Sequence, residues 1–253
     1  MSKLPKEHRF IDLSDYGRPI ARRIANSLKE TSYTPIDVTI WFIISGLTGI
    51  ACILAGYYWA AAFFLIFKSI LDAADGELAR LKKTPSHTGR YFDSVADILL
   101  NLLIFISIWY VTDTHFILCI LAFLGIQLQG TLYNYYYVIL RNTVNGDTTS
   151  RIFEYDTPVA MKGEKQRNVN ILFRIYKALY GIFDKIIYAL DANAADGKKL
   201  PNFLMTAVST FGLGFQLLII SLMLALDYKD YIISFFLWYS LMIVVFIGIR
   251  KTL

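Results

Sequence analysis

Residues 71–97 read LDAADGELARLKKTPSHTGRYFDSVAD, and this stretch decides how the chain is built. Two aspartates precede its basic centre and two follow it, and apolar residues extend outward from both pairs. An aspartate at the centre of a membrane helix costs roughly 2.5–3.5 kcal/mol. If these segments enter a membrane, the four aspartates therefore need a partner that compensates their charge.

The composition of the 253-residue chain excludes an ordinary soluble protein. Hydrophobic residues make up 56%, charged residues 18%, and the mean hydropathy is +0.47, whereas soluble domains average about 45–50% apolar and about 25% charged residues. The same numbers exclude a disordered chain. Two cysteines in apolar runs and three scattered histidines indicate neither a disulfide scaffold nor a zinc site. A polytopic membrane protein remains.

Six segments are long and apolar enough to cross the hydrocarbon core, which takes about 20 residues. The expected spans are 36–58, 59–80, 91–111, 116–140, 203–226 and 231–249. We therefore predict an all-α polytopic membrane protein with six transmembrane helices. The N-terminal residues show no apolar stretch of the kind that a cleavable signal peptide contains.

Basic residues indicate the orientation of these spans. Of the 25 lysines and arginines, seven lie in residues 1–34, four in 80–90, ten in 141–200 and two after the last span. All four segments fall on one side of a six-span arrangement, so both termini are expected in the cytoplasm. Basic loops that face anionic lipid explain the net charge of +5, and no nucleic-acid partner is expected.

Two segments outside the spans have their own character. Residues 1–34 are predicted to form a cytoplasmic segment, in which apolar positions spaced by four residues over 18–29 indicate an amphipathic helix on the membrane surface. Residues 35–253 would form the transmembrane domain. This domain includes a cytoplasmic insertion at 141–200, with a second amphipathic helix from about residue 168 to 190. Such long connections are usually functional.

Helix geometry allows the four aspartates to converge. Asp72 and Asp75 are three residues apart and Asp93 and Asp97 are four apart, so each pair shares one helix face. With about 1.5 Å of rise per residue, all four lie roughly 5–12 Å inside the cytoplasmic ends of their helices. Lys68, one turn before Asp72, can pair with that carboxylate or reach a phosphate.

Converging carboxylates repel one another, and hard divalent cations such as Mg²⁺ or Mn²⁺ offset that repulsion. Two such ions would clamp a phosphate during an in-line displacement. Gly76 leaves backbone room beside them, and Arg80 can pair with a phosphate or with Glu77. Two alternatives stay open. Intramembrane carboxylates also mark ion and proton pathways, and a structural salt-bridge cluster would use the few local cations.

The spacing D-x2-D-G-x2-A-R-x8-G-x3-D-x3-D resembles the signature of the CDP-alcohol phosphotransferase family. Its fixed positions are Asp72, Asp75, Gly76, Ala79, Arg80, Gly89, Asp93 and Asp97. The start of the first span, with Thr34, Pro35, Val38 and Thr39, is also similar to the family. The resemblance covers about residues 18–140, and nothing is carried over to 141–200.

This resemblance implies a reaction in which a hydroxyl attacks the phosphate next to the lipid or alcohol group of a CDP-activated substrate, and CMP leaves. Asp72, Asp75 and Asp93 would hold two Mg²⁺ or Mn²⁺ ions. Asp97 would ligate one ion and act as the general base. The residues implied in CDP binding are Gly76, Ala79, Arg80, Gly89 and Thr34. The resemblance also implies a homodimer.

The acceptor alcohol is the least determined part of this interpretation. A polar stripe on the fourth span is either packing or the lining of an acceptor pocket. The candidate pocket residues are Arg90, Asn134, Arg141 and Arg151. We favour CDP-diacylglycerol as the donor and inositol phosphate or another polyol as the acceptor. The alternatives are a CDP-amino-alcohol enzyme with a lipid acceptor, and a carboxylate-based ion transporter.

Overall fold

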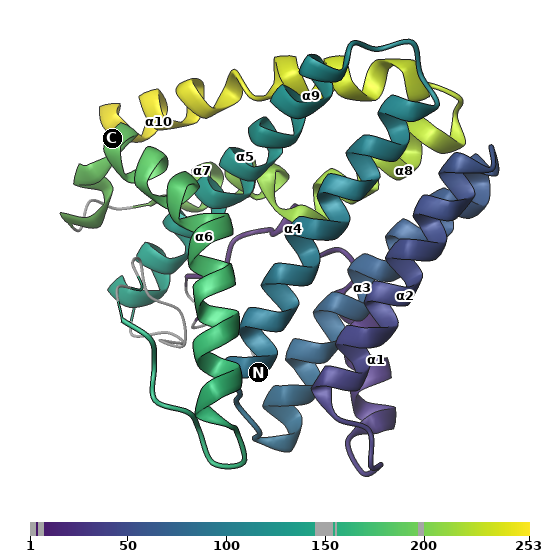
Figure 1. Cartoon of the computed structure of the whole chain (residues 1–253). Helices are drawn as coiled ribbons and strands as arrows, with labels where there is room; N and C mark the ends of the chain where they lie inside the picture. Colours follow the sequence, from purple (N-terminus) through teal and green to yellow (C-terminus); the bar gives the residue numbers. More distant parts are fainter. Residues whose placement is uncertain (1–3, 5–7, 145–153, 155, 197–199) are drawn as a thin grey trace.

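A computed structural model describes residues 4, 8–144, 154, 156–196 and 200–253 of the chain. The described residues form helices and connections and contain no strand, which confirms the predicted all-α fold. Three long helices, α2, α3 and α4, lie side by side at one edge of the molecule, and α6 runs next to α4 (Figure 1).

The first elements are η2 (Leu13–Asp15), α1 (Arg18–Leu28) and α2 (Pro35–Leu54). The predicted amphipathic helix is α1, and it packs along α3 through its buried Ala21 and Ala25. A capping box begins α2, because the hydroxyl of Thr34 accepts from the Asp37 N–H and the Asp37 carboxylate accepts from the Thr34 N–H.

The charged stretch forms the hairpin of α3 (Tyr58–Lys82) and α4 (His87–Tyr110). Lys83, in the left-handed conformation with φ of 53°, ends α3. Ser86 caps α4 by accepting a hydrogen bond of 2.8 Å from the Gly89 N–H. Helix α2 packs against both helices of the hairpin.

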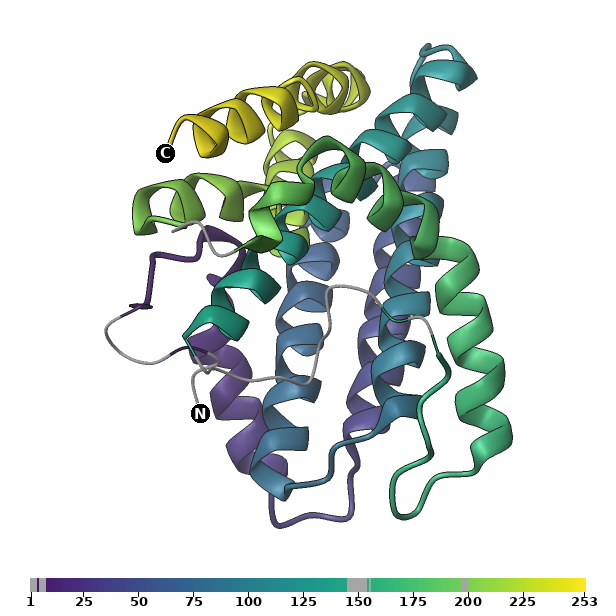
Figure 2. The same cartoon turned by 90° about the vertical axis from the view of Figure 1, so that its left-hand side faces the viewer.

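The next helices are α5 (Phe116–Thr143) and α6 (Gln166–Leu190). The helix predicted at about 168–190 is thus present and begins two residues earlier. It contacts both α4 and α5, and Figure 2 shows it descending along the outside of this pair. The insertion therefore supplies a wall beside the charged hairpin.

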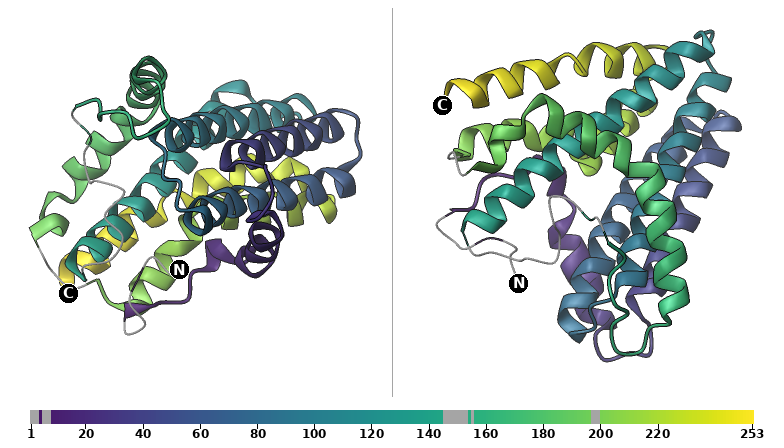
Figure 3. Two further views of the ribbon diagram at one scale, coloured as in Figure 1. Left: turned by 90° about the horizontal axis from the view of Figure 1, so that it is seen from below. Right: turned by 60° about the vertical axis from the view of Figure 1, so that its left-hand side comes forward.

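The C-terminal part of the chain does not form the two straight spans that were predicted there. A bend of 54° at Gly212 divides the predicted fifth span. The last two helices, α9 and α10, run across α2 and α3 rather than alongside them, as Figures 1 and 2 and the right panel of Figure 3 show. The elements are η3 (Ala192–Asp196), α7 (Asn202–Val208), η4 (Ser209–Phe211), α8 (Leu213–Ala225), η5 (Lys229–Tyr231), α9 (Ile232–Tyr239) and α10 (Met242–Thr252).

Close packing fixes the N-terminal segment on α8. A Cβ atom on Gly214 would lie 1.9 Å from the carbonyl oxygen of Ser14, so only glycine permits this approach. The N–H of Leu13 also donates to the hydroxyl of Ser209 at 2.9 Å. Residues 12–16 are therefore anchored to the helical core, although they precede every predicted span.

The multi-pass character is confirmed, but the count of six spans is not. By length and composition, the helices that can cross a membrane are Pro35–Leu54, His87–Tyr110, Phe116–Thr143 and Lys229–Thr252, and the bent pair Asn202–Phe211 with Leu213–Ala225 makes a fifth. Helix α3 is excluded because every 18-residue stretch of it contains Lys68, Asp72 and Asp75. The presence of these charged residues in an otherwise apolar helix therefore needs an explanation.

Candidate active site

Three carboxylates of the hairpin meet between α3 and α4. Asp72 and Asp75 from α3 and Asp93 from α4 each offer an oxygen that lies within 4.8 Å of the other two. Asp75 is buried, and the other two are half-buried. We call these residues the carboxylate triad. The spacing of three residues on α3 places its two members on one face, as helix periodicity predicts.

The triad has the chemistry of a divalent-cation site. Asp75 accepts a hydrogen bond of 2.6 Å from the hydroxyl of Thr39 on α2. Asp93 presents a buried carboxylate oxygen that has no hydrogen-bond partner among the described residues. A buried acceptor of this kind is destabilising unless something binds it. Mg²⁺ and Mn²⁺ prefer such oxygen ligands, so the residues present fit either ion.

The fourth aspartate of the signature lies beside the triad and has a different partner. The ammonium group of Lys68 forms an ion pair with the Asp97 carboxylate. Lys68 is fully buried, and its nitrogen also lies 5.0 Å from the centre of the Phe42 ring. Sequence reasoning had offered Asp72 or a phosphate as the partner of Lys68, and it missed Asp97 because that contact joins two different helices.

A second charged group lies around Glu77, on the side of α3 that faces α1. This buried carboxylate binds Arg80 at 3.3 Å, Arg22 at 3.6 Å and Arg18 at shorter range. Of the two partners predicted for Arg80, the structure therefore contains Glu77. The guanidinium of Arg80 lies over Gly76, 3.6 Å from where a Cβ atom would be, and its buried Nε has no hydrogen-bond partner in the described part of the chain.

The other residues predicted to bind CDP occupy helix starts or a partly buried position. Thr34 caps α2, and the N–H of Gly89 donates to Ser86 in the first turn of α4. Ala79 is half-buried on α3. These positions border the end of the hairpin at which α3 ends and α4 begins, and a role in CDP binding stays a prediction for all three.

The predicted acceptor residues are dispersed. Arg90 binds Glu154 at 2.5 Å, and its guanidinium lies 4.6 Å from the Tyr91 ring centre. Arg141 is buried on α5, and Asn134 on the same helix is exposed. Arg151, the remaining candidate, lies outside the described residues. Arg90 lies on α4 and the other two residues lie on α5, and their common role in acceptor binding stays a prediction.

The 141–200 insertion contributes to the surroundings of the triad. Tyr180 of α6 donates a hydrogen bond of 2.8 Å to the backbone oxygen of Ser94, the residue after Asp93. The ring of Tyr176 lies 5.2 Å from that of Tyr91. The sequence carried no signal for these contacts beyond the amphipathic pattern of the helix.

Residues just before α6 fasten the insertion to the start of α4. Glu164 accepts from the Thr88 N–H at 2.6 Å, the Met161 N–H at 2.9 Å and the Ser86 hydroxyl at 2.7 Å. Partial burial opposes ionisation, but these hydrogen bonds dominate and lower the pKa of Glu164 to about 2. The carboxylate is therefore ionised under all ordinary conditions.

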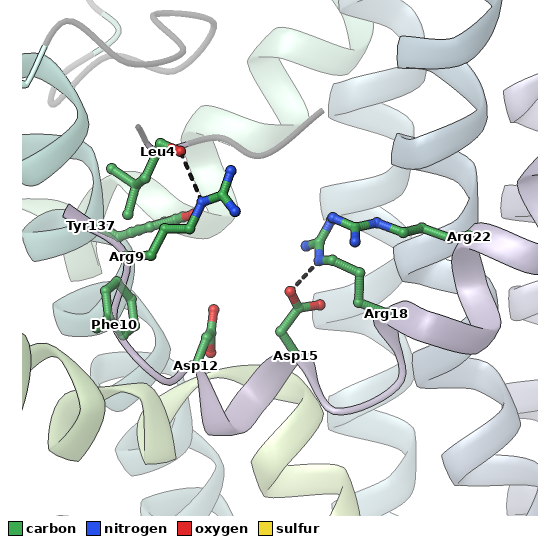
Figure 4. A pocket seen from close by; sticks show the side chains of 8 residues that line it. All are labelled: Leu4, Arg9, Phe10, Asp12, Asp15, Arg18, Arg22 and Tyr137. Atoms are coloured by element: carbon green, nitrogen blue, oxygen red, sulfur yellow. Dashed lines mark hydrogen bonds and ion pairs between the residues drawn. The ribbon is translucent and has the colours of Figure 1, made fainter. Parts of the chain in front are cut away.

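A pocket adjoins the Glu77 group between the N-terminal segment, α1 and α5. Its volume is about 110 Å³, and its lining residues are Leu4, Arg9, Phe10, Asp12, Asp15, Arg18, Arg22 and Tyr137. Figure 4 shows the guanidinium of Arg9 on one side of the space and those of Arg18 and Arg22 on the other. We call it the N-terminal pocket. The sequence had suggested a surface helix here, without a binding role.

Comparison with known proteins agrees with the site. No curated protein matches the chain. A family model described as CDP-alcohol phosphatidyltransferase matches residues 25–160, which is more than half of the chain and includes the whole triad. With three of the four signature aspartates brought together between α3 and α4, the chain belongs to the CDP-alcohol phosphatidyltransferase family.

Proposed function

We propose that the protein transfers a phosphatidyl group from CDP-diacylglycerol to the hydroxyl of a small polar alcohol and releases CMP. Membership of the family supports phosphatidyl transfer from a CDP-alcohol within a membrane. The observation that carries the proposal is the carboxylate triad, whose oxygens lie within 4.8 Å of one another. Such a site can hold cations against a diphosphate.

Asp72, Asp75 and Asp93 would hold Mg²⁺ or Mn²⁺, with Asp97 as a further ligand if two ions bind. When bound, these ions would neutralise the negative charge of the diphosphate and make the acceptor hydroxyl more acidic. The hydroxyl of Thr39 orients Asp75 by its hydrogen bond of 2.6 Å, which supports this assignment. The unpartnered oxygen of Asp93 supports it independently.

The chain's own residues can carry the proton transfer. The acceptor oxygen forms a bond to the phosphorus next to the lipid, the bond between that phosphorus and the bridging oxygen breaks, and CMP leaves with the electron pair. We assign the proton of the acceptor hydroxyl to Asp97, acting as general base. The ion pair with Lys68 would fix the direction of this carboxylate, so Lys68 is a positioning residue.

The CDP part of the donor is proposed to lie against Gly76, Ala79, Arg80, Gly89 and Thr34. The buried Nε of Arg80, which has no hydrogen-bond partner among the described residues, supports a phosphate contact at that residue. Arg90, Asn134, Arg141 and Arg151 stay the sequence-based candidates for the acceptor. The distribution of basic residues supports a cytoplasmic site and cytoplasmic termini. A homodimer is the expected assembly.

The test uses purified protein in neutral-lipid nanodiscs with CDP-diacylglycerol and a panel of acceptors. The panel contains inositol, inositol phosphate, glycerol phosphate and serine, and a parallel reaction offers CDP-ethanolamine with diacylglycerol. We expect CMP release that needs Mg²⁺ or Mn²⁺ and stops with a chelator. Asp97→Asn should abolish turnover and largely retain metal binding.

Two results would overturn the proposal. Absence of CMP release with every donor and acceptor would remove the transferase assignment. Cation flux through protein-containing liposomes without CMP release would favour the ion transporter instead. Release of CMP only from CDP-ethanolamine would keep the enzyme class and reverse the roles of lipid and alcohol.

A further inference from the structure

Helix α6 lies outside the part of the chain that matches the family, and it contacts the helix that carries two signature aspartates. The family match ends at residue 160, whereas α6 covers Gln166–Leu190. It packs along α4, and Figure 2 shows the two helices side by side. Since Asp93 and Asp97 belong to α4, contacts made by α6 can affect the position of these carboxylates.

The side chain of Tyr180 makes a contact beside these aspartates. Its hydroxyl donates a hydrogen bond of 2.8 Å to the backbone oxygen of Ser94. Ser94 directly follows Asp93 and precedes Asp97 by three residues, so it lies within the single helical turn that joins them. The hydrogen bond therefore ties α6 to the turn of α4 that presents both carboxylates.

The negative charges of the site reach the Tyr180 phenol. Burial raises the pKa of this group most, and the charges of Asp97, Asp93 and Asp72 raise it further above its ordinary value of 10.0. The hydroxyl therefore keeps its proton at ordinary pH and stays a hydrogen-bond donor. The same effect shows that the phenol lies close to the signature aspartates of both helices.

Neighbouring aromatic rings restrict the direction of the Tyr180 side chain. The ring of Tyr176 is stacked on that of Tyr180, with the ring centres 5.0 Å apart, and it lies 5.2 Å from the ring centre of Tyr91 on α4. Tyr91 is fully buried, and its hydroxyl donates to Glu154 at 2.6 Å. Close packing of this kind limits the rotamers of each ring. The hydroxyl of Tyr180 is therefore held toward Ser94.

We propose that Tyr180 is a positioning residue through which α6 keeps Asp93 of α4 in reach of Asp72 and Asp75 of α3. This inference rests on the proposed function. Like charges push the two helices apart when no cation is bound, and a fixed bond to α4 limits that displacement. Groups that orient the ligands of a metal site raise its affinity for the ion. A helix outside the family match would thus tune the site that the family shares.

The decisive variant is Tyr180→Phe, which removes the hydroxyl and keeps the ring and its stacking. Tyr176→Phe is the matched control, because it removes a hydroxyl from the neighbouring turn of the same helix and leaves the bond to Ser94 intact. The thermal midpoint of each protein is recorded, so that an effect on folding is separated from an effect on the site.

Mn²⁺ affinity is measured by electron paramagnetic resonance on protein in neutral-lipid nanodiscs, without substrates. We expect Tyr180→Phe to weaken Mn²⁺ binding about fivefold, the factor that corresponds to the loss of one ordinary hydrogen bond. In the transfer assay kcat should fall by a similar factor, with KM for the donor within about twofold of the parent. Tyr176→Phe should match the parent in all three quantities.

Equal Mn²⁺ affinity in the parent and Tyr180→Phe would overturn the inference, and so would an equal loss in Tyr176→Phe. A lower thermal midpoint of Tyr180→Phe with parental Mn²⁺ affinity would assign the hydrogen bond to fold stability alone and also overturn it. Weaker Mn²⁺ binding by Tyr180→Phe, in a protein whose parent releases no CMP, would support this inference for the metal site while refuting the proposed function.

Discussion

Carboxylates are buried in two regions of the molecule, and the two regions differ in the groups that lie beside the negative charge. At the junction of α5, α6 and α10, Asp191 forms an ion pair with Arg250, and both residues are at most 2% exposed. The hydroxyl of Tyr136 donates to the Asp191 carboxylate at 2.6 Å, and that of Tyr135 donates to its backbone oxygen at 3.0 Å. This charge is neutralised by the chain itself.

The carboxylate triad instead gathers several like charges in one place. Three acidic groups meet within 4.8 Å, an Asp93 oxygen has no hydrogen-bond partner among the described residues, and the buried Lys68 pairs with Asp97 instead. Like charges at this range oppose folding unless a cation or protons offset them. The comparison teaches that the Asp191 pair is complete within the chain, whereas the triad offers carboxylate oxygens that could hold a metal ion.

The largest effect is expected from Asp93→Asn. Removing this ligand should lower the rate of CMP release by at least about 10²–10³-fold, the range for loss of one group that stabilises developing charge. The thermal midpoint should stay the same or rise, because one source of repulsion is removed. The exposed Asp113→Asn serves as the control and should leave both quantities unchanged.

Arg250→Met should have the opposite effects to Asp93→Asn, because it should lower stability and leave activity unchanged. Breaking a buried ion pair leaves Asp191 without its cation and should lower the free energy of unfolding by about 3–5 kcal/mol. The double variant Arg250→Met with Asp191→Asn should recover part of this loss in thermal unfolding. Activity per folded molecule should be unchanged. Loss of activity at full stability would contradict the structural role of this pair.

The substitution Lys68→Met tests whether Asp97 depends on its ion pair. Asp97 would lose the cation that orients it, and kcat should fall by about 10–100-fold, the usual range for groups that orient catalytic or ligand side chains. Lys68→Arg keeps the charge and should recover part of the rate. The measurement is CMP release with saturating donor and acceptor. Equal kcat in all three proteins would show that Asp97 needs no positioning.

The smallest effect concerns the insertion. The pKa of Glu164 is lowered from its ordinary value of 4.5 to about 2 in the folded protein. Its contribution to stability is therefore fully present above pH 4.5 and is lost as the pH falls toward 2. Glu164→Gln should lower the thermal midpoint by roughly 2–4 °C at pH 7.

This difference between Glu164→Gln and the parent should shrink as the pH is lowered from about 5 to about 2.5, because the parent carboxylate then takes up its proton. The exposed Glu30→Gln, on the connection before α2, is the control and should show no difference at any pH. A constant difference across this range would contradict the assignment to the charged form of Glu164.

Much of the fold and the triad follows from local sequence. The amphipathic period predicts α1, the Thr34-Pro35 start predicts α2, and the helical spacing predicts that Asp72 and Asp75 share a face. These features depend on residues that are near one another in the chain. Helix periodicity and capping chemistry determine them without knowledge of the tertiary packing.

The remainder depends on contacts between distant residues. The Lys68–Asp97 pair joins two helices, and the N-terminal segment packs on α8 because Gly214 allows Ser14 to approach. The bend at Gly212 and the crosswise course of α9 and α10 likewise follow from packing, since their apolar composition matches straight spans equally well. Hydropathy measures where a segment is apolar and not the direction in which it runs.

The most direct test of the central claim is a titration with Mn²⁺, followed by electron paramagnetic resonance, of the parent protein and of Asp75→Asn, Asp93→Asn and Asp191→Asn. The account predicts that the parent and Asp191→Asn, where it folds, bind Mn²⁺ alike and that both triad variants lose this binding. Undetectable binding by the parent, or equal binding by all four proteins, would contradict a metal site between α3 and α4.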